Sequence, residues 1–111
     1  MLDRIAGDIE KYMDLLSARQ KLVASNIANA DTPGYRTKDI DFQAEFQSAI
    51  NTVPNVVEVN DLRVKNDGNN VSLDRESRLL AENALRFGLA SNLLRSQIRL
   101  VRSAIDGGNS A

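Results

Sequence analysis

Two long stretches of helical periodicity, one at each end of the chain, limit its fold more than any other feature. In residues 1–30, apolar side chains recur mostly at alternating spacings of three and four residues. In residues 72–106, a second stripe falls within about 100° of arc, the width of one buried helix face. The stripe positions are Leu2, Ile5, Ile9, Tyr12, Leu16, Val23 and Ala30, and then Leu80, Ala84, Phe87, Leu94, Ile98, Val101 and Ile105. We therefore expect two long terminal helices that form an antiparallel, coiled-coil-like pair.

Polar residues interrupt the first stripe at two of its positions. Arg19 and Asn26 stand where the spacing predicts an apolar side chain. Asn29 follows three residues after Asn26 on the same helical face, although asparagine is a poor helix former. Amides beside a helix end can bond to main-chain groups or to a neighbouring chain. We expect hydrogen bonds of this kind from Asn26 and Asn29.

The centre of the chain, residues 31–71, is rich in turn-forming residues. The run at residues 31–35 predicts a type II turn, because Pro33 fixes φ at the first central position and Gly34 supplies the positive φ of the second. Residues 66–70, Asn-Asp-Gly-Asn-Asn, form another dense turn cluster. The chain therefore turns sharply at two places between its helices.

Between these turns the apolar spacing changes from helical to alternating. Phe42, Phe46 and Ile50 lie four residues apart and predict a short amphipathic helix. Its start is expected near Asp39 or Asp41. The residues that suggest two brief strands, and hence a small β-hairpin, are Val57 with Val59 and Leu62 with Val64.

These patterns predict a mainly α-helical fold in one elongated domain. The expected divisions of residues 1–111 are a helix over 1–30, a turn-rich central segment over 31–71, a helix over 72–106 and a flexible tail over 107–111. Ser72 is a suitable N-cap for the second helix, and Asp74 and Glu76 suit the positive end of its dipole. Gly107 can adopt the left-handed conformation that ends a helix.

A pair of helices with narrow stripes has little interior. A core of this size, with five aromatic residues in the chain, roughly balances the conformational entropy of folding. The apolar residues expected to stay partly uncovered beside the stripes are Leu15, Leu22, Ile27, Leu79, Leu89, Leu93 and Leu100. Such residues suggest contact with further copies or with partners. The chain therefore has the character of a subunit of an assembly.

The chain contains no histidine and no cysteine. This excludes a Ser-His-Asp triad, a Cys-His dyad, a disulfide and any metal site built from imidazole or thiolate. Asp39, Asp41 and Glu45 are better explained as capping and solvated residues than as catalytic acids, because no partner base is indicated. A calcium loop around Gly68 is rejected, since Arg63 would stand where an acid is required. We expect no enzyme, no cofactor and no metal site.

The formal net charge of −1 is unevenly distributed. Residues 31–73 carry seven acids against four bases, and residues 74–105 carry three acids against six arginines. The arginines do not form one stripe with interleaved aromatic residues, since Arg75, Arg78 and Arg86 fall opposite the apolar stripe. We therefore expect no nucleic-acid binding. The charges among the first thirty residues and the lack of an 18-residue apolar run predict neither a signal peptide nor insertion in a membrane.

Residues 25–35, Ser-Asn-Ile-Ala-Asn-Ala-Asp-Thr-Pro-Gly-Tyr, resemble the N-terminal signature of the bacterial flagellar axial proteins, the family of rod, hook and hook-associated subunits. Two further runs, residues 39–42 and residues 67–76, narrow the resemblance to the proximal rod subunits. Ser72 and Ser77 depart from the family pattern, in which Asp and Met are frequent there. The motif residues carried over from the family are Ser25, Asn26, Ala28, Asn29, Thr32, Pro33, Gly34 and Tyr35.

The resemblance implies a structural subunit of the flagellar basal-body rod that assembles helically, transmits torque and supports motility. It also implies export by the flagellar type III apparatus without a cleaved signal peptide, and assembly in the periplasmic space with further copies, other rod proteins and the membrane-side base. There are two alternatives. The chain could be a second type of proximal rod subunit, or it could be a non-flagellar adaptor protein that forms a helical hairpin. The helix faces expected to make assembly contacts are Leu2, Ile5, Ile9, Leu16, Val23, Leu80, Phe87, Leu94, Ile98, Val101 and Ile105.

Overall fold

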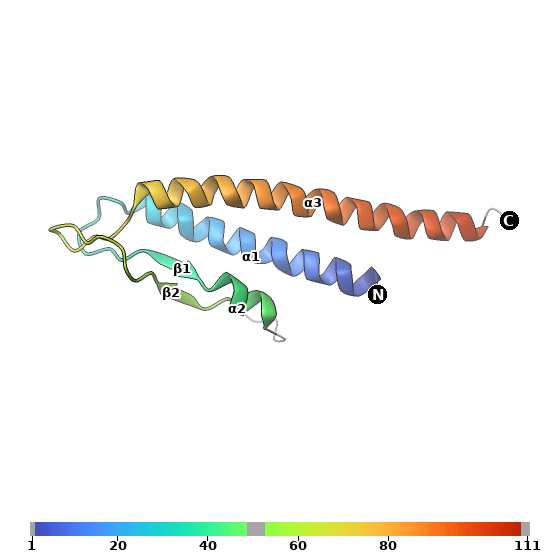
Figure 1. The fold of residues 1–111 in the computed structure, drawn as a ribbon, viewed down its shortest axis with the longest axis horizontal. Helices are drawn as coiled ribbons and strands as arrows, with labels where there is room; N and C mark the ends of the chain where they lie inside the picture. The colour runs from blue at the N-terminus through green and yellow to red at the C-terminus, as the bar shows by residue number, and fades with distance from the viewer. Residues whose placement is uncertain (1, 49–52, 110–111) are drawn as a thin grey trace.

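The computed structural model is elongated, with extents of 72 × 26 × 17 Å, and describes residues 2–48 and 53–109 (Figure 1). The elements in chain order are α1 (Leu2–Ala28), β1 (Lys38–Ile40), α2 (Phe42–Gln47), β2 (Val56–Glu58) and α3 (Leu73–Asn109). The predicted fold class is confirmed: two long terminal helices pack together, and the segment between them in the sequence forms a short helix and a small antiparallel hairpin.

The two long helices run antiparallel, so that both ends of the chain point toward the same end of the molecule (Figure 1). The helix α3 is the longer of the two, with 37 residues against 27 in α1, and it continues past the start of α1. Its first residue follows Ser72, whose hydroxyl accepts a hydrogen bond from the main-chain nitrogen of Arg75 at 3.2 Å, as expected of an N-cap. At the other end the helix extends beyond the predicted end at residue 106, through Gly107 and Gly108 to Asn109.

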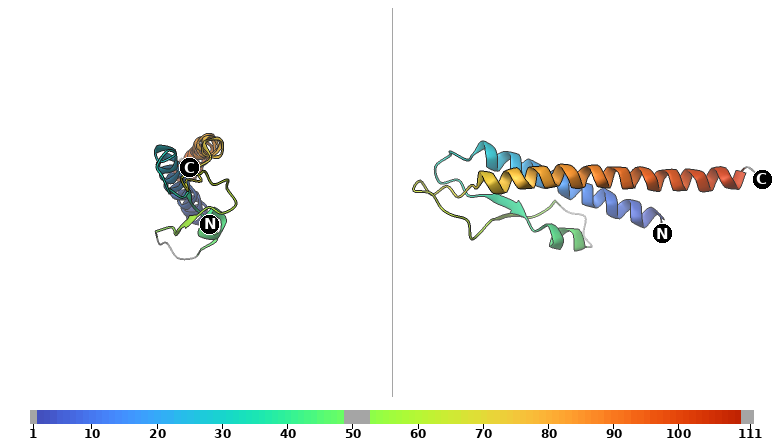
Figure 2. Two further views of the ribbon diagram at one scale, coloured as in Figure 1. Left: turned by 90° about the vertical axis from the view of Figure 1, so that its left-hand side faces the viewer. Right: turned by 45° about the horizontal axis from the view of Figure 1, so that its top comes forward.

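The α1 side of the helix seam follows the predicted stripe. Ile9, Leu16 and Val23 are all buried, and Leu16 and Val23 are 2% and 1% exposed. Leu15, which we expected to remain partly uncovered, is also buried. The reason is that β1 and α2 pack along α1 and form a third layer, which a two-helix arrangement lacks (Figure 2).

The α3 side of the seam lies one position away from the predicted stripe. Its buried residues are Glu76, Leu79, Asn83 and Ala90. Leu79 was expected to lie outside the seam. The predicted stripe residues border the seam instead of filling it: Leu80, Phe87, Ile98, Val101 and Ile105 are exposed, and all but Leu80 line open grooves against α1. The difference arises because the seam contains polar residues: the amide of Asn83 donates to the side-chain oxygen of Gln20 at 3.2 Å. Apolar periodicity does not predict a buried seam position when a hydrogen-bonded polar residue occupies it.

One of the two strands of the hairpin is the predicted segment around Val57, and the other is not. β1 pairs with β2 in antiparallel register, with Lys38 opposite Glu58 and Ile40 opposite Val56. The residues 62–64, which we expected to form a strand, are irregular. The partner strand is instead residues 38–40, because α1 holds that segment in place through the contacts described below.

The short helix α2 lies against α1 near its middle. Its N-cap is Asp41, whose carboxylate accepts a hydrogen bond from the main-chain nitrogen of Ala44 at 3.2 Å. The rings of Phe42 and Phe46 meet Tyr12 edge-on, with centroids 5.3 and 5.9 Å away. Ile50, the third residue of the predicted stripe, lies outside the described residues.

Candidate functional site

The turns at residues 31–35 and 66–70 lie side by side at one end of the helix pair (Figure 1). Gly34 has a φ of +75°, and the nitrogen of Tyr35 donates to the carbonyl of Thr32 at 3.2 Å, as in the predicted type II turn. The nitrogen of Gly34 also donates to the carbonyl of Asp67 at 2.9 Å. A Cβ atom on Gly68 would lie 3.5 Å from Gly34 Cα. The two turns therefore touch through their main chains.

Asn69 joins the end of α1 to the start of α3. Its side chain is fully buried. The amide nitrogen donates to the carbonyls of Asn29 and Thr32, at 2.9 and 2.8 Å, and the amide oxygen accepts from the nitrogen of Val71 at 2.8 Å. One side chain thereby satisfies three main-chain groups, two of them in residues 29–32 after α1 and one at Val71 shortly before α3.

Asn70 likewise binds main-chain groups, in this case those of residues next to the two strands. Its side-chain oxygen accepts from the nitrogen of Thr37 at 2.6 Å, and its amide nitrogen donates to the carbonyl of Val59 at 3.3 Å. The Thr37 hydroxyl donates to the carbonyl of Asn70 at 3.2 Å. Both residues are buried, so the loss of either would leave main-chain groups without partners.

Asn26 binds the outer edge of β1 to α1. Its amide nitrogen donates to the carbonyl of Lys38 at 2.8 Å, and its oxygen accepts from the nitrogen of Lys38 at 3.1 Å. The Tyr35 hydroxyl donates to the same oxygen at 2.9 Å. Asn26 is 1% exposed, and its side chain makes the pair of main-chain hydrogen bonds that a neighbouring strand would make. This is why the segment at Lys38 is extended, and it explains the polar residue in the apolar stripe of α1.

The other motif residues extend this set of contacts at the surface. The amide of Asn29 donates to the carbonyl of Ser25 at 2.8 Å, and the hydroxyl of Thr32 donates to the amide oxygen of Asn29 at 3.0 Å. The hydroxyls of Ser25 and Tyr35 lie 3.3 Å apart. Ala28 and Pro33 are exposed. We call the connected residues Asn26, Asn29, Tyr35, Thr37, Asn69 and Asn70 the turn-end network.

A cluster of charges lies next to the turn-end network. Asp39 accepts hydrogen bonds from Arg19 Nε and Nη2, at 3.0 and 2.9 Å, and from Arg75 Nη2 at 2.7 Å. Arg75 Nη1 donates to Glu76 Oε1 at 2.8 Å, and Glu76 is completely buried. Among the described residues, Glu76 Oε2 has no hydrogen-bond partner. The cluster joins α1, β1 and α3.

The surroundings of Asp39 favour its charged form. Burial of the carboxyl opposes ionisation, but the hydrogen bonds from Arg19, from the Ile40 nitrogen and from Arg75 hold the pKa of Asp39 below its ordinary value. Two expectations are corrected here. Asp39 is a buried ion-pair partner instead of a capping or solvated acid, and Arg75 faces β1 instead of lying on the outer side of α3.

The residues expected on the assembly faces lie in two different environments. Ile9, Leu16 and Val23 are buried within the chain, and Leu94 is half-buried. Ile5 is 37% exposed, and the exposed fractions on α3 rise to 50% at Ile98 and 59% at Ile105; Leu80, Phe87 and Val101 are also exposed. The side chain of Leu2 lies outside what the structure describes. The turn end is thus satisfied internally, whereas α3 presents apolar side chains to its surroundings.

Across residues 2–48 and 53–109, no three carboxylates come together as a metal site would require. None of the described helices is both long enough and apolar enough to span a membrane.

Comparison with known proteins assigns the chain to a family. A family model described as "Flagella basal body rod protein" matches residues 13–36, which include the first half of the turn-end network. The flagellar basal body rod protein FlgB of Salmonella typhimurium is 30% identical over 98% of this chain and 100% of its own length. The chain belongs to the FlgB family. The FlgB proteins of Yersinia enterocolitica, 31% identical over 97% of the chain and all of the relative, and of Borrelia hermsii, 30% identical over 86% and 90%, agree.

Membership of the FlgB family confirms the resemblance inferred from the motif residues, and identifies the chain as a structural component of the flagellar basal body rod. This is a family of rod proteins and not of enzymes. Sequence reasoning missed the roles of Asn69, Asn70 and Arg19. The available signal was the placement of polar residues: Arg19 interrupts an apolar stripe, and the two asparagines follow Gly68, which already supplies the positive φ of the turn.

Proposed function

We propose that this FlgB-family chain is a building block of the rod shaft, which assembles helically with further copies and with other rod proteins and transmits torque from the motor to the hook. The observation that carries the proposal is the set of exposed apolar side chains along α3, which lie on two sides of the helix: Leu89, Leu93 and Leu100 on one side, and Ile98 and Ile105 on the other, beside the start of α1. An apolar surface of this length on a chain with a satisfied polar end is typical of a protein that is completed by its neighbours.

The two ends of the molecule have different tasks in this proposal. The turn-end network and the Asp39 cluster fix α1, α3 and the hairpin to one another through buried hydrogen bonds. The exposed faces of the helices then meet other subunits in contacts that use different surfaces on each copy. Contacts of this kind extend as an open helical series. Torque would pass through many packed helix faces, each held at a fixed angle by its turn end.

The setting of the proposal follows from the family. Membership of this rod family suggests that the chain is exported by the flagellar apparatus. The chain would then assemble in the periplasmic space and contact the membrane-side base. The whole chain would act as one elongated domain. The FlgB relatives favour this subunit type over the other proximal rod type. A helical-hairpin adaptor would form a stable one-to-one complex with a partner, whereas a rod subunit would form extended oligomers.

The test is an aspartate at Ile98, which is half exposed and lies on the proposed assembly face. A buried, unpaired charge would oppose contact with a neighbour, so Ile98→Asp should abolish rod incorporation and swimming. Because the site is half exposed in the single chain, the helix content by circular dichroism should stay unchanged. Ser103→Asp, on an exposed position of the same helix, is the matched control and should swim normally. Normal rods with Ile98→Asp would refute the proposed assembly face.

A further inference from the structure

The hairpin has one closed edge and one open edge. On the closed edge, the nitrogen and the carbonyl of Lys38 both bind the side chain of Asn26, so these main-chain groups of β1 point away from β2. Glu58 lies opposite Lys38, and two opposed residues of antiparallel strands either exchange both main-chain hydrogen bonds or exchange none. The nitrogen and the carbonyl of Glu58 therefore point to the open edge of β2, on the outer side of the hairpin (Figure 1).

The open edge of β2 is uncovered. Among residues 2–48 and 53–109, no hydrogen bond to the main chain of β2 closes it. All three residues of β2 are exposed, with Val56 and Val57 at 53% and 46%. An open strand edge with apolar side chains is a template for pairing with another strand. A hairpin of two strands is also marginally stable alone, so a third strand would complete the sheet.

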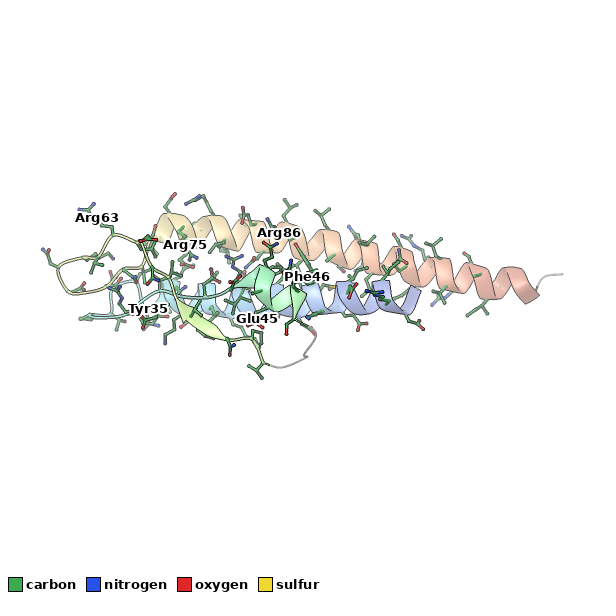
Figure 3. All side chains as sticks on the ribbon, turned by 60° about the horizontal axis from the view of Figure 1, so that its bottom comes forward. Tyr35, Glu45, Phe46, Arg63, Arg75 and Arg86 are labelled. Atoms are coloured by element: carbon green, nitrogen blue, oxygen red, sulfur yellow. The ribbon has the colours of Figure 1, made fainter. Side chains whose placement is uncertain are left out.

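Residues 62–64 have the sequence pattern of a strand without its structure. Leu62 and Val64 alternate with Arg63, but the segment is irregular. No described residue makes a hydrogen bond to its main chain, and Val64 is 50% exposed. The side chain of Arg63 extends away from the body of the molecule (Figure 3). The segment is therefore available for pairing.

Residues 62–64 cannot reach β2 of their own chain. The chain continues from β2 toward the turn end, so the segment would have to fold back to lie beside the strand (Figure 1). Lys65 prevents this, because its nitrogen donates to the carbonyl of Asn69 at 2.8 Å and its amine donates to the carbonyl of Ala30 at 3.0 Å. These bonds hold the end of the segment in the turn cluster.

We infer that residues 62–64 of one copy pair in antiparallel register with the open edge of β2 of a second copy. The inference rests on the proposed function, since it names one surface through which two copies meet. The strand edge and the segment are different surfaces of one molecule. Each copy can therefore give its segment to one neighbour and receive the segment of another, which gives an open series of copies.

Charge complementarity selects this occupant and its register. With Arg63 opposite Glu58, a base faces an acid, and Val64 then faces Val57 on the other side of the sheet. Both charged side chains are exposed, and among the described residues neither belongs to an ion pair. The register therefore pairs two unmatched charges and two exposed valines.

Two other partners for Glu58 fit less well. Lys38 lies opposite Glu58 within the chain, but its amine lies 5.7 Å from the centroid of the Tyr35 ring. Pairing of β2 with β2 of a second copy, with Val57 opposite Val57, would bring two Glu58 carboxylates to one face of the sheet. Like charges at such positions are unfavourable.

The absence of cysteine from the chain makes a direct test possible. Two differently tagged copies, one with Val57→Cys and one with Val64→Cys, would be produced together in motile cells, and basal bodies would be isolated under oxidising conditions. Both sites are exposed, so neither change should unfold the subunit. The inference predicts a disulfide-linked dimer that contains both tags and disappears on reduction. Val57→Cys with Leu85→Cys, an exposed position on α3, is the matched control and should give about one tenth of that product or less.

Charge reversal in the same strain gives a second measurement. Glu58→Arg in both copies would place a base opposite a base and should lower the yield of linked dimer by about threefold. Glu58→Arg together with Arg63→Glu restores opposite charges and should restore the yield. Glu10→Arg reverses an exposed acid on α1 and should leave the yield unchanged.

The outcomes separate the inference from the proposed function. Rods that contain both cysteine variants and support swimming, but show no more linkage between positions 57 and 64 than the control pair, would overturn the inference and leave the function standing. Linkage between two Val57→Cys copies in its place would also overturn it, as would a double reversal that fails to restore the yield. Basal bodies that lack even the unmodified chain would overturn both.

Discussion

Replacement of Asn26 by alanine tests the turn-end network most sharply. Asn26 is 1% exposed, and its amide satisfies the nitrogen and the carbonyl of Lys38 together with the hydroxyl of Tyr35. A buried polar group that loses its partner costs about 1–3 kcal/mol. The variant leaves two main-chain groups unpaired, while the Tyr35 hydroxyl still lies 3.3 Å from that of Ser25. We therefore expect Asn26→Ala to lower the free energy of unfolding by about 2–6 kcal/mol.

The assay is urea unfolding of the isolated chain, followed by circular dichroism at 222 nm. Tyr35→Phe removes only one of the three contacts and should cost about 1 kcal/mol. Asn60→Ala removes an exposed amide and should change the free energy of unfolding by less than about 0.5 kcal/mol. The reasoning would be refuted if Asn26→Ala matched Asn60→Ala, or if Tyr35→Phe cost as much as Asn26→Ala.

Two further substitutions address the charge cluster and the turn. The pKa of Asp39 lies below its ordinary value of 3.8, so the stability it contributes is present above that pH and is lost as the pH falls through the folded-state pKa. Asp39→Asn should therefore be less stable than the natural protein at pH 7 in urea unfolding, and the difference should shrink well below pH 3.8; an equal difference at both pH values would contradict this. Gly34→Val forces a branched side chain to a φ of +75° and should cost about 1–2 kcal/mol in the same assay, whereas Gly7→Ala, in a helix and with open space for a Cβ, should stabilise by up to about 1 kcal/mol. Equal stability of the Gly34→Val variant would show that the turn relaxes.

The periodic features of the fold are predictable from the sequence. The two helices, the N-caps at Asp41 and Ser72 and the turn at Gly34 all follow from local spacing and residue type, and the structure has each of them. Local physics decides such features, because the residues concerned lie within a few positions of one another.

The features that escape the sequence depend on contacts between distant residues. The strand at residues 38–40 exists because Asn26 supplies its hydrogen bonds, and no pattern within 38–40 records this. Asp39 was interpreted as a solvated acid because Arg19 and Arg75 are far from it in the chain. The buried face of α3 lies one residue away from the predicted stripe. The reason is that Asn83 and Glu76 occupy buried positions, and a search for apolar residues does not count them. Polar burial is therefore what sequence periodicity misses in this molecule.

The candidate site divides in the same way. The resemblance selected Asn26, Asn29 and Tyr35 as motif residues, and the structure places all three in the turn-end network. It gave no role to Asn69 and Asn70, which complete that network from the other side. The motif before the hairpin and the run before α3 are parts of a single hydrogen-bonded unit, which becomes visible only in three dimensions.

The most direct test is hydrogen exchange of the chain, alone and within isolated basal bodies. It asks whether the turn end is stabilised by contacts within the chain, and whether the C-terminal end of α3 is stabilised by neighbouring subunits. We predict that the amides of Lys38, Thr37 and Val71, which the turn-end network binds, are protected in the isolated chain. The amides of residues 98–106 should exchange quickly in the isolated chain and slow by at least about tenfold in the rod. Equal protection of both regions in the isolated chain, or no slowing of residues 98–106 on assembly, would contradict this account.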